Sequence, residues 1–351
     1  MMKIISISVL SLLLTCFISS IYCQIPPNLD NNWKLNTKKS DEFNDTILDD
    51  SKWDVLDISN GIGYSWGGAE YFRPENVAVD NNILQLIVER KPNNHNKYYS
   101  GGVRSVNHNF SYGYFEIYAK LPGFYNNGIP CGDGFWPAFW TYYVEEDEDG
   151  CRIIHDEIDI LEPSGRQYAN AKSNVAGWHD EHPDCEIDHI KVCEAQYNHN
   201  QPLFKDYHKY AVEWLPDRII FYFDDQPFYA QYNHPKMIMK PQYVVIDQQM
   251  DKTYNVNSNT PFPQYMLIDY FRYYELNTSF CEQTLSITSN SQLNKHLPGV
   301  RKNIIIGDGT NSLYLSNNQS ITLRATNEIT INGDFIVPIG CELNLIPTPC
   351  Y

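Results

Sequence analysis

Short runs of apolar residues, many of them alternating with polar ones, recur along the whole chain. Successive side chains of a β-strand point to opposite faces, so this alternation predicts strands. Gly, Pro and Asn clusters separate the runs, and no long segment repeats with the helical period. The predicted strands are residues 83–88, 114–121, 154–161, 218–223, 243–246 and 265–274. We therefore predict an all-β fold, a β-sandwich of two packed sheets.

The composition changes after Glu275. The segment 276–351 is poor in Trp and rich in Asn, Ser, Thr and Ile, and it still alternates at 320–325 and 328–332. This pattern predicts a small C-terminal β module behind the main domain. The sequence leaves two roles open for the module, a carbohydrate-binding role and a stabilising or spacing role.

The N-terminus has the features of a secretory signal peptide. Lys3 precedes an apolar run over residues 4–21, and cleavage is expected near Cys23. We divide the chain into a signal peptide (1–23), a main β domain (24–276) and the C-terminal β module (277–351). The mature protein is then expected to be secreted, periplasmic or at the cell surface. Because the apolar run is long enough to span a bilayer, a membrane anchor is the alternative.

Nine cysteines occur in the chain, and Cys16 and Cys23 precede or adjoin the predicted cleavage site. An exported protein permits disulfides between the others. The local pairs that we predict, with Cys281 left free, are Cys131–Cys151, Cys185–Cys193 and Cys341–Cys350. The sequence alone leaves other pairings open.

Charge and aromatic content narrow the class of partner. The formal net charge is −17, which disfavours nucleic acid, anionic membranes and heavily sulfated polymers. Aromatic residues make up 14% of the chain, with 26 Tyr and 7 Trp, more than a core requires. Such a surplus favours a surface that faces carbohydrate. We expect a monomer that binds a neutral polysaccharide and neither nucleic acid nor a membrane.

The most informative segment is the strand that carries Glu157, Asp159 and Glu162. Ile158 and Ile160 alternate with the acids, so Glu157 and Asp159 point to the same face. Glu162 is out of phase, and a one-residue β-bulge after Asp159 would return it to that face. Three carboxyls on one wall acquire separated pKa values, as acid/base catalysis requires. A solvated acidic strand face is the plainer alternative.

Aromatic residues flank this strand in the sequence. Aromatic faces stack on sugar rings, and paired carboxyls cleave glycosidic bonds, so the combination indicates a sugar site. His155 shares the parity of Glu157 and should face the same cleft. The predicted substrate-binding residues are Trp136, Trp140, Trp178, His179 and His155. Core packing of one of the first two tryptophans and a structural role for His155 are the alternatives.

Together these motifs resemble glycoside hydrolase family sixteen in its bulged form, E-x-D-x-x-E. Further segments agree with the family in order: Asp41-Glu42-Phe43, Ser100 to Ser105, Tyr112 to Glu116, Trp136 to Trp140, Tyr207 to Trp214 and Leu267 to Arg272. The likeness covers residues 28–276. It implies a concanavalin-like jelly roll of two curved antiparallel sheets, whose concave face forms the substrate cleft of a catalytic domain.

The resemblance also implies roles for particular residues. Glu157 would be the nucleophile, Glu162 the general acid and later the base, and Asp159 a hydrogen-bond partner of Glu157. Asn76 matches a position that often faces the glycan. Members of the family often carry a structural calcium ion near acids that match Glu42 and Asp269, and surface acids are the alternative there. No cofactor is expected for catalysis.

The bulged motif resembles that of laminarinases, so the predicted activity is that of a retaining endo-β-1,3-glucanase. Agarases, porphyranases and carrageenases carry the same motif and cut β-1,4 bonds in algal galactans. The segments 124–133 and 144–153 are longer than a minimal laminarinase needs, which argues against specificity for a glucan. A non-catalytic glycan-binding protein and a transglycosylase are two further alternatives.

Overall fold

The computed structural model of the protein describes most of the main domain and of the C-terminal module. The described residues are 33–60, 68–92, 97–146, 148, 152–163, 172–181, 189–215, 218–232, 234, 236–238, 240–253, 256, 258–276, 282–293, 300–316 and 319–347. The predicted signal peptide lies outside them. Within these ranges, no helix has the length and apolar character needed to cross a bilayer.

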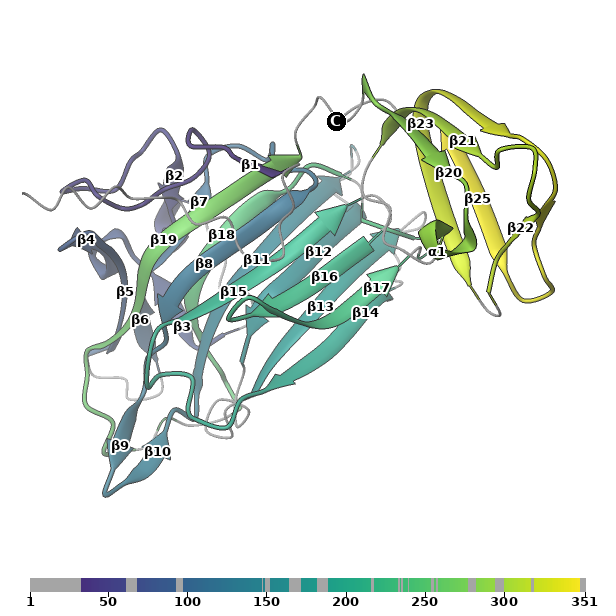
Figure 1. The fold of residues 1–351 in the computed structure, drawn as a ribbon. Helices are drawn as coiled ribbons and strands as arrows, with labels where there is room; N and C mark the ends of the chain where they lie inside the picture. Colours follow the sequence, from purple (N-terminus) through teal and green to yellow (C-terminus); the bar gives the residue numbers. More distant parts are fainter. Residues whose placement is uncertain are drawn as a thin grey trace, which may run out of the picture.

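Two β-sheets dominate the main domain (Figure 1). The first has the order β17-β16-β15-β8-β19-β5-β6-β3, with β1 paired to β19 and β4 to β5. Its pairs are antiparallel except for β3 with β6. Its strands are β1 (Trp33–Leu35), β3 (Glu70–Phe72), β4 (Val77–Asp80), β5 (Ile83–Arg90), β6 (Tyr98–Ser100), β8 (Gly113–Lys120), β15 (His208–Leu215), β16 (Arg218–Phe223), β17 (Gln226–Tyr232) and β19 (Gln264–Leu276).

The second sheet carries the acidic strand near its middle, in the order β14-β13-β12-β11-β18-β7-β2. Its strands are β2 (Trp53–Val55), β7 (Gly102–Ser105), β11 (Phe135–Glu146), β12 (Arg152–Glu162), β13 (Lys172–Glu181), β14 (His189–Asn198) and β18 (Tyr243–Met250). All of its recorded pairs are antiparallel. A hairpin of β9 (Phe124–Asn126) and β10 (Ile129–Cys131) projects from the main domain (Figure 1) and accounts for the long segment 124–133.

The core lies between the two sheets. Phe139 of β11 meets Phe271 of β19 edge to face, with ring centroids 6.1 Å apart, and both side chains are fully buried. Ile158 of the acidic strand is also fully buried. Each such side chain contributes about 1.5–3 kcal/mol of transfer free energy. The apolar residues of β12 therefore anchor the strand, and Glu157 and Asp159 are left on the opposite face of the sheet.

Each of the six strands predicted from alternation is present, and several extend beyond the predicted ends. A tight turn follows β16, where Asp224 and Asp225 have φ of 46° and 64°. Two consecutive positive φ values are typical of the tight turns that join antiparallel strands. Helical structure is limited among the described residues to the short elements η1 (Ile58–Asn60), η2 (Pro74–Asn76) and α1 (Asn290–Leu293).

The C-terminal module is a separate β structure with its own core (Figure 1). Its pairings are all parallel, in a four-stranded sheet β20-β21-β23-β25 and a two-stranded sheet of β22 and β24. The strands are β20 (Thr284–Ile287), β21 (Arg301–Ile306), β22 (Leu313–Tyr314), β23 (Ser320–Ile331), β24 (Phe335–Ile336) and β25 (Glu342–Pro347). Leu293, Ile304 and Leu323 are among the side chains buried in its core.

The three described cysteines, Cys131, Cys193 and Cys341, are free thiols. The disulfide pairs predicted from local spacing are therefore wrong for these three residues, and their predicted partners lie outside the described residues. Cys193 lies on β14, where its sulfur faces Gly177 of the neighbouring strand; a Cβ at that position would lie 2.8 Å from it. Packing against the adjacent strand thus takes the place of the predicted cross-link.

Candidate active site

The acidic strand contains the predicted bulge. Asp159 pairs with Trp140 of β11, and the next pair along β11 is Phe139 with Leu161. On the other side Asp159 pairs with Ala176, and the next recorded pair is Glu162 with Asn174. In both ladders β12 has one residue more than its partner. A bulge of this kind reverses the parity of all later residues, so Glu162 returns to the face of Glu157 and Asp159.

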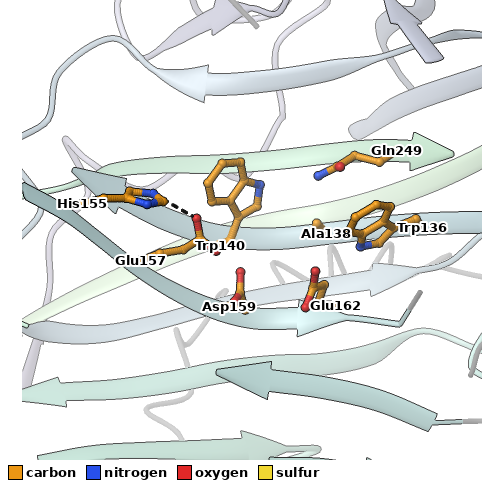
Figure 2. Close-up of a pocket in the computed structure, with 8 residues that line it drawn as sticks. All are labelled: Trp136, Ala138, Trp140, His155, Glu157, Asp159, Glu162 and Gln249. Carbon is orange, nitrogen blue, oxygen red and sulfur yellow. Dashed lines mark ion pairs between the residues drawn. The ribbon is translucent and has the colours of Figure 1, made fainter. Parts of the chain in front are cut away.

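The three carboxyls line one pocket of about 320 Å³ (Figure 2). Figure 2 shows Glu157, Asp159 and Glu162 in a row along β12, with side chains of β11 across from them. The residues that line the pocket are Trp136, Ala138, Trp140, His155, Glu157, Asp159, Glu162 and Gln249. The predicted catalytic trio and three of the five aromatic or histidine candidates are thus brought together.

Burial and mutual repulsion raise the pKa of two of the three acids. Desolvation and the charge of Glu157 raise the pKa of Glu162 to about 7, and the indole N–H of Trp136 opposes this rise. Desolvation, followed by the charges of Glu157 and Glu162, raises the pKa of Asp159 well above its usual range. Below neutral pH the pocket therefore holds two protonated carboxyls beside Glu157, the distribution that a proton donor next to a nucleophile requires.

His155 and Trp178 hold the trio from the side. His155 Nε2 lies 3.3 Å from Glu157, and its Nδ1 lies 3.5 Å from the buried carboxyl of Asp180. The indole N–H of Trp178 donates to Asp159 Oδ2 at 3.2 Å. The predicted position of His155 in the cleft is confirmed. Trp178 contacts the trio, and its stacking on a sugar stays a prediction.

The two tryptophans of β11 both line the pocket, but they differ in exposure. Trp140 is 5% exposed and stacks on Tyr142, with ring centroids 5.1 Å apart. Trp136 is partly exposed and lies beside Glu162 in Figure 2. The packing alternative thus applies largely to Trp140, which leaves Trp136 as the better candidate for stacking on a sugar ring.

The prediction that His179 lines the cleft is wrong. His179 pairs with Asp156, and its Nδ1 lies 2.5 Å from the carboxyl of that residue. Asp156 is 1% exposed and has the parity opposite to Glu157, so both side chains face the interior between the sheets. Neighbours in a strand point to opposite faces, and Trp178 occupies the cleft side. His179 instead supplies the partner that a buried Asp156 needs.

Asn76 is likewise not a cleft residue in the structure. It ends the short helix η2 and is 2% exposed, and its amide nitrogen donates to the carbonyl of Ile87 at 3.1 Å. The side chain therefore ties this turn to β5. The prediction that Asn76 binds the glycan is wrong for this arrangement, because the side chain is tied to β5 and is not among those that line the pocket of the three carboxyls.

Glu42 and Asp269 do not fit a calcium site as the structure has them. Both oxygens of Glu42 accept from Arg272, at 2.8 and 2.9 Å, so the carboxylate is already paired with a guanidinium. Within the described ranges, no group of three or more His, Cys, Asp or Glu side chains is placed to hold a metal ion. Calcium favours six to eight oxygen ligands. The ion stays a prediction without support from these two side chains.

The sequence interpretation missed two residues of the site, Gln249 and Asp247 on β18. Gln249 lines the pocket opposite Trp136, with which it pairs. Asp247 is fully buried and accepts from the Trp140 indole at 3.4 Å. Their signal was the polar run Asp247-Gln248-Gln249 at the end of an otherwise apolar strand. A central strand with polar residues of one parity indicates a functional face.

A family model described as "Beta-porphyranase A-D, GH16 domain" matches residues 33–276. The chain belongs to this family. Membership in glycoside hydrolase family sixteen, predicted from the bulged motif, is thereby confirmed. The matched range ends with β19, so it contains both sheets of the main domain and excludes the parallel-stranded module.

Proteins related to the chain act on different glycans, according to their names. The glucan endo-1,3-beta-glucosidase A1 of Niallia circulans is 27% identical over 69% of this chain and 38% of its own length. The beta-glucanase of Rhodothermus marinus is 31% identical over 54% of this chain and 63% of its own. The match thus spans less than two thirds of either relative. The beta-porphyranase B of Zobellia galactanivorans is 25% identical over 57% of this chain and 68% of its own.

One of these relatives, porphyranase B, also has a solved structure that shares the fold of the main domain. The crystal structure of porphyranase B from Zobellia galactanivorans has a TM-score of 0.55 to this chain, at 22% identity, and covers 71% of this chain and 97% of its own. At this identity the likeness shows the fold alone. The all-β jelly-roll sandwich predicted from the sequence is confirmed.

Proposed function

We propose that the protein is a retaining endo-β-glycan hydrolase. The observation that carries the proposal is the bulged strand, which brings Glu157, Asp159 and Glu162 to one pocket. Retaining glycosidases need a carboxylate nucleophile and a carboxylic acid of raised pKa on either side of the scissile bond. Glu157 supplies the nucleophile. Glu162 supplies the acid, because its pKa is raised to about 7.

In the first step the Glu157 carboxylate attacks the anomeric carbon of the sugar. The bond from that carbon to the leaving oxygen breaks, and Glu162 gives its proton to this oxygen. A glycosyl ester on Glu157 results, and the leaving part of the chain departs as an alcohol. Burial keeps Glu162 protonated up to about neutral pH, so the proton is available when the bond breaks.

In the second step a water molecule replaces the leaving sugar. Glu162, now ionised, accepts a proton from this water, whose oxygen attacks the anomeric carbon and releases Glu157. Two inversions at the same carbon restore the β configuration. The same raised pKa serves both steps, because Glu162 must donate in one and accept in the other.

Asp159 and His155 prepare Glu157 for attack. Asp159 is held protonated by burial and by its charged neighbours, and in this form it shares a hydrogen bond with Glu157. His155, 3.3 Å from Glu157 and 3.5 Å from Asp180, orients the nucleophile from the other side. Two partners on one carboxylate restrict its rotamers and keep it aimed at the anomeric carbon.

Among β-glycans, a β-1,4-linked algal galactan is the first candidate substrate. It is supported by the family model, which is that of β-porphyranases. The formal net charge of −17 favours sections of such a polymer that carry no sulfate. A β-1,3-glucan, predicted from the sequence, is the second candidate, because glucanases share 27% and 31% of the aligned residues.

We also propose that the protein is exported and acts as a monomer. An endo-hydrolase of long glycans meets its substrate outside the cytoplasm, which agrees with the signal peptide predicted over residues 1–23. We expect a monomer, because the pocket is built from strands of a single sheet. The C-terminal module keeps its two candidate roles, glycan binding and spacing.

The test is the release of reducing ends from laminarin, lichenan, agarose, porphyran and carrageenan, with Glu157→Gln as the control. We expect cleavage of agarose or porphyran by the wild type and none by the variant. Cleavage of laminarin alone would keep the mechanism and make the glucan the substrate. Equal release by wild type and variant, or no release from any polymer, would overturn the proposed function.

A further inference from the structure

Gln249 presents an unused hydrogen-bond acceptor to the pocket. The residue is 4% exposed and lines the cavity beside Trp136 and Trp140. Its amide nitrogen donates to both oxygens of Asp247, at 3.2 and 3.3 Å. Its amide oxygen is buried and has no hydrogen-bond partner among the described residues. An orphaned buried acceptor costs about 1–3 kcal/mol, so an acceptor in this position indicates a ligand that donates to it.

Asp247 decides which way the amide points. Its carboxyl accepts from Gln249 and from the Trp140 indole, and it is fully buried. The NH₂ group of Gln249 donates to this carboxyl, so the amide oxygen points away from it. Gly102 makes room for this carboxyl, because a Cβ there would lie 2.8 Å from the Cβ of Asp247. The glycine on the neighbouring strand β7 therefore leaves space for the buried carboxyl of Asp247.

A buried carboxyl without a cation is unfavourable for folding. Among the described residues, the recorded side-chain partners of Asp247 are Gln249 and Trp140, both neutral. Burial, followed by the charges of Glu70 and Glu162, raises the pKa of Asp247 well above its usual range. Burying an ionisable group in this way costs free energy of folding, so the presence of Asp247 here indicates a functional role.

We propose that the amide oxygen of Gln249 accepts a hydrogen bond from a free hydroxyl group of the sugar bound beside Glu162, and that Asp247 is the positioning residue that fixes this oxygen in the pocket. A sugar sulfated at that hydroxyl has no proton to donate to Gln249, and its negative charge would meet the carboxylate of Glu157 in the same pocket. The subsite therefore selects an unsubstituted sugar. This inference rests on the proposed glycan hydrolase function and adds a specificity-determining residue to it.

Three variants of the full chain test the role of Gln249. Gln249→Met keeps the length of the side chain and removes the acceptor, and kcat/KM should fall about tenfold. Gln249→Glu, protonated at pH 5 beside Asp247, still donates to Asp247 and keeps an acceptor oxygen in the pocket. We expect it to stay within about threefold of the wild type at pH 5. The matched control Gln231→Met, on β17 of the other sheet, should leave kcat/KM unchanged.

The role of Asp247 is tested by a double-mutant cycle. Asp247→Leu keeps a side chain of similar size and removes both oxygens that accept from Gln249, so it lets the amide turn in the pocket and should lower kcat/KM by about threefold. If Asp247 acts through Gln249, the double variant should lose no more than Gln249→Met alone. Losses that multiply would overturn the positioning role.

The assays use agarose, or laminarin if agarose is not cleaved, and each variant is compared with the wild type in the same run. Equal losses of kcat/KM in Gln249→Met and Gln249→Glu, or no loss of kcat/KM in Gln249→Met, would overturn the inference. If the wild type cleaves neither polymer, the proposed function fails separately. The affinity of the Glu157→Gln protein for agarose, with and without Gln249→Met, then tests the subsite alone: tighter or equal binding by the double variant would contradict it.

Discussion

Trp178 donates its indole N–H to Asp159 across the β12–β13 pair, at 3.2 Å. The contact holds the central carboxyl of the trio from the strand next to it. The N–H lowers the pKa of Asp159, while burial and the charges of Glu157 and Glu162 raise it by more. Asp159 is therefore oriented by Trp178 and kept protonated by its neighbours, so its own proton points to Glu157.

Asparagine at position 159 should retain part of the catalytic activity. Asp159→Asn keeps an N–H that can donate to Glu157, and we expect kcat to fall by about tenfold. Asp159→Ala removes the donor and leaves the Trp178 indole without its acceptor, so we expect a fall of about a hundredfold or more. Steady-state kinetics of the two variants check this order. Equal activity of the alanine and asparagine variants would contradict the role of Asp159.

The pH dependence should show an alkaline limb near pH 7. The pKa of Glu162 is raised to about 7, and only its protonated form can donate to the leaving oxygen. Activity is therefore present below this pKa and is lost as the pH rises through it. The measurement is kcat/KM against pH, because this ratio reports the free enzyme.

Trp136→Phe should move this limb to higher pH. The Trp136 N–H lowers the pKa of Glu162, so its removal raises that pKa further. The aromatic face is kept, which limits the change in sugar stacking. A limb that stays in place or moves to lower pH would show that Trp136 does not act on Glu162.

The two glutamates should differ in their response to the leaving group. An aryl glycoside with an acidic phenol needs little proton donation, so Glu162→Gln should still form the glycosyl–enzyme from it and release a burst of phenol. Glu157→Gln should release none, because the nucleophile is absent. Rapid-mixing absorbance measurements distinguish the cases. A burst from the Glu157 variant would reverse the assignment of roles.

Calcium should not change the thermal stability of the protein. Arg272 holds both oxygens of Glu42, so the predicted site lacks a free carboxylate there. We expect the same Tm in 5 mM CaCl₂ and in 5 mM EDTA, within about 1 °C. Differential scanning calorimetry provides the measurement. A rise of several degrees with calcium would support the ion predicted from the sequence and require Arg272 to release Glu42.

The bulge was predictable because parity along a strand is a strict rule. Two acids alternated with isoleucines and the third was out of phase, so one inserted residue was the simplest repair. The same rule would have excluded His179, since Trp178 beside it points into the cleft. Asn76 was assigned by likeness to a family position, and its burial depends on packing against β5, which no local pattern reveals.

Gln249 and Asp247 were harder to find because β18 follows the acidic strand by more than eighty residues and pairs with β11 rather than β12. Nothing in the local sequence states which strands become neighbours. The parallel pairing of the C-terminal module was hidden for a similar reason, because residues alternate in the same way in parallel and antiparallel strands. Strand order in a sheet is set by tertiary packing.

The most direct test of the central claim is the configuration of the first product, followed by ¹H NMR during digestion of agarose, or of laminarin if agarose is not cleaved. Double displacement through Glu157 predicts that the new reducing end appears first as the β anomer and then mutarotates, and that Glu157→Gln produces neither signal. An α anomer formed first, or a product from the Glu157→Gln protein, would contradict the mechanism.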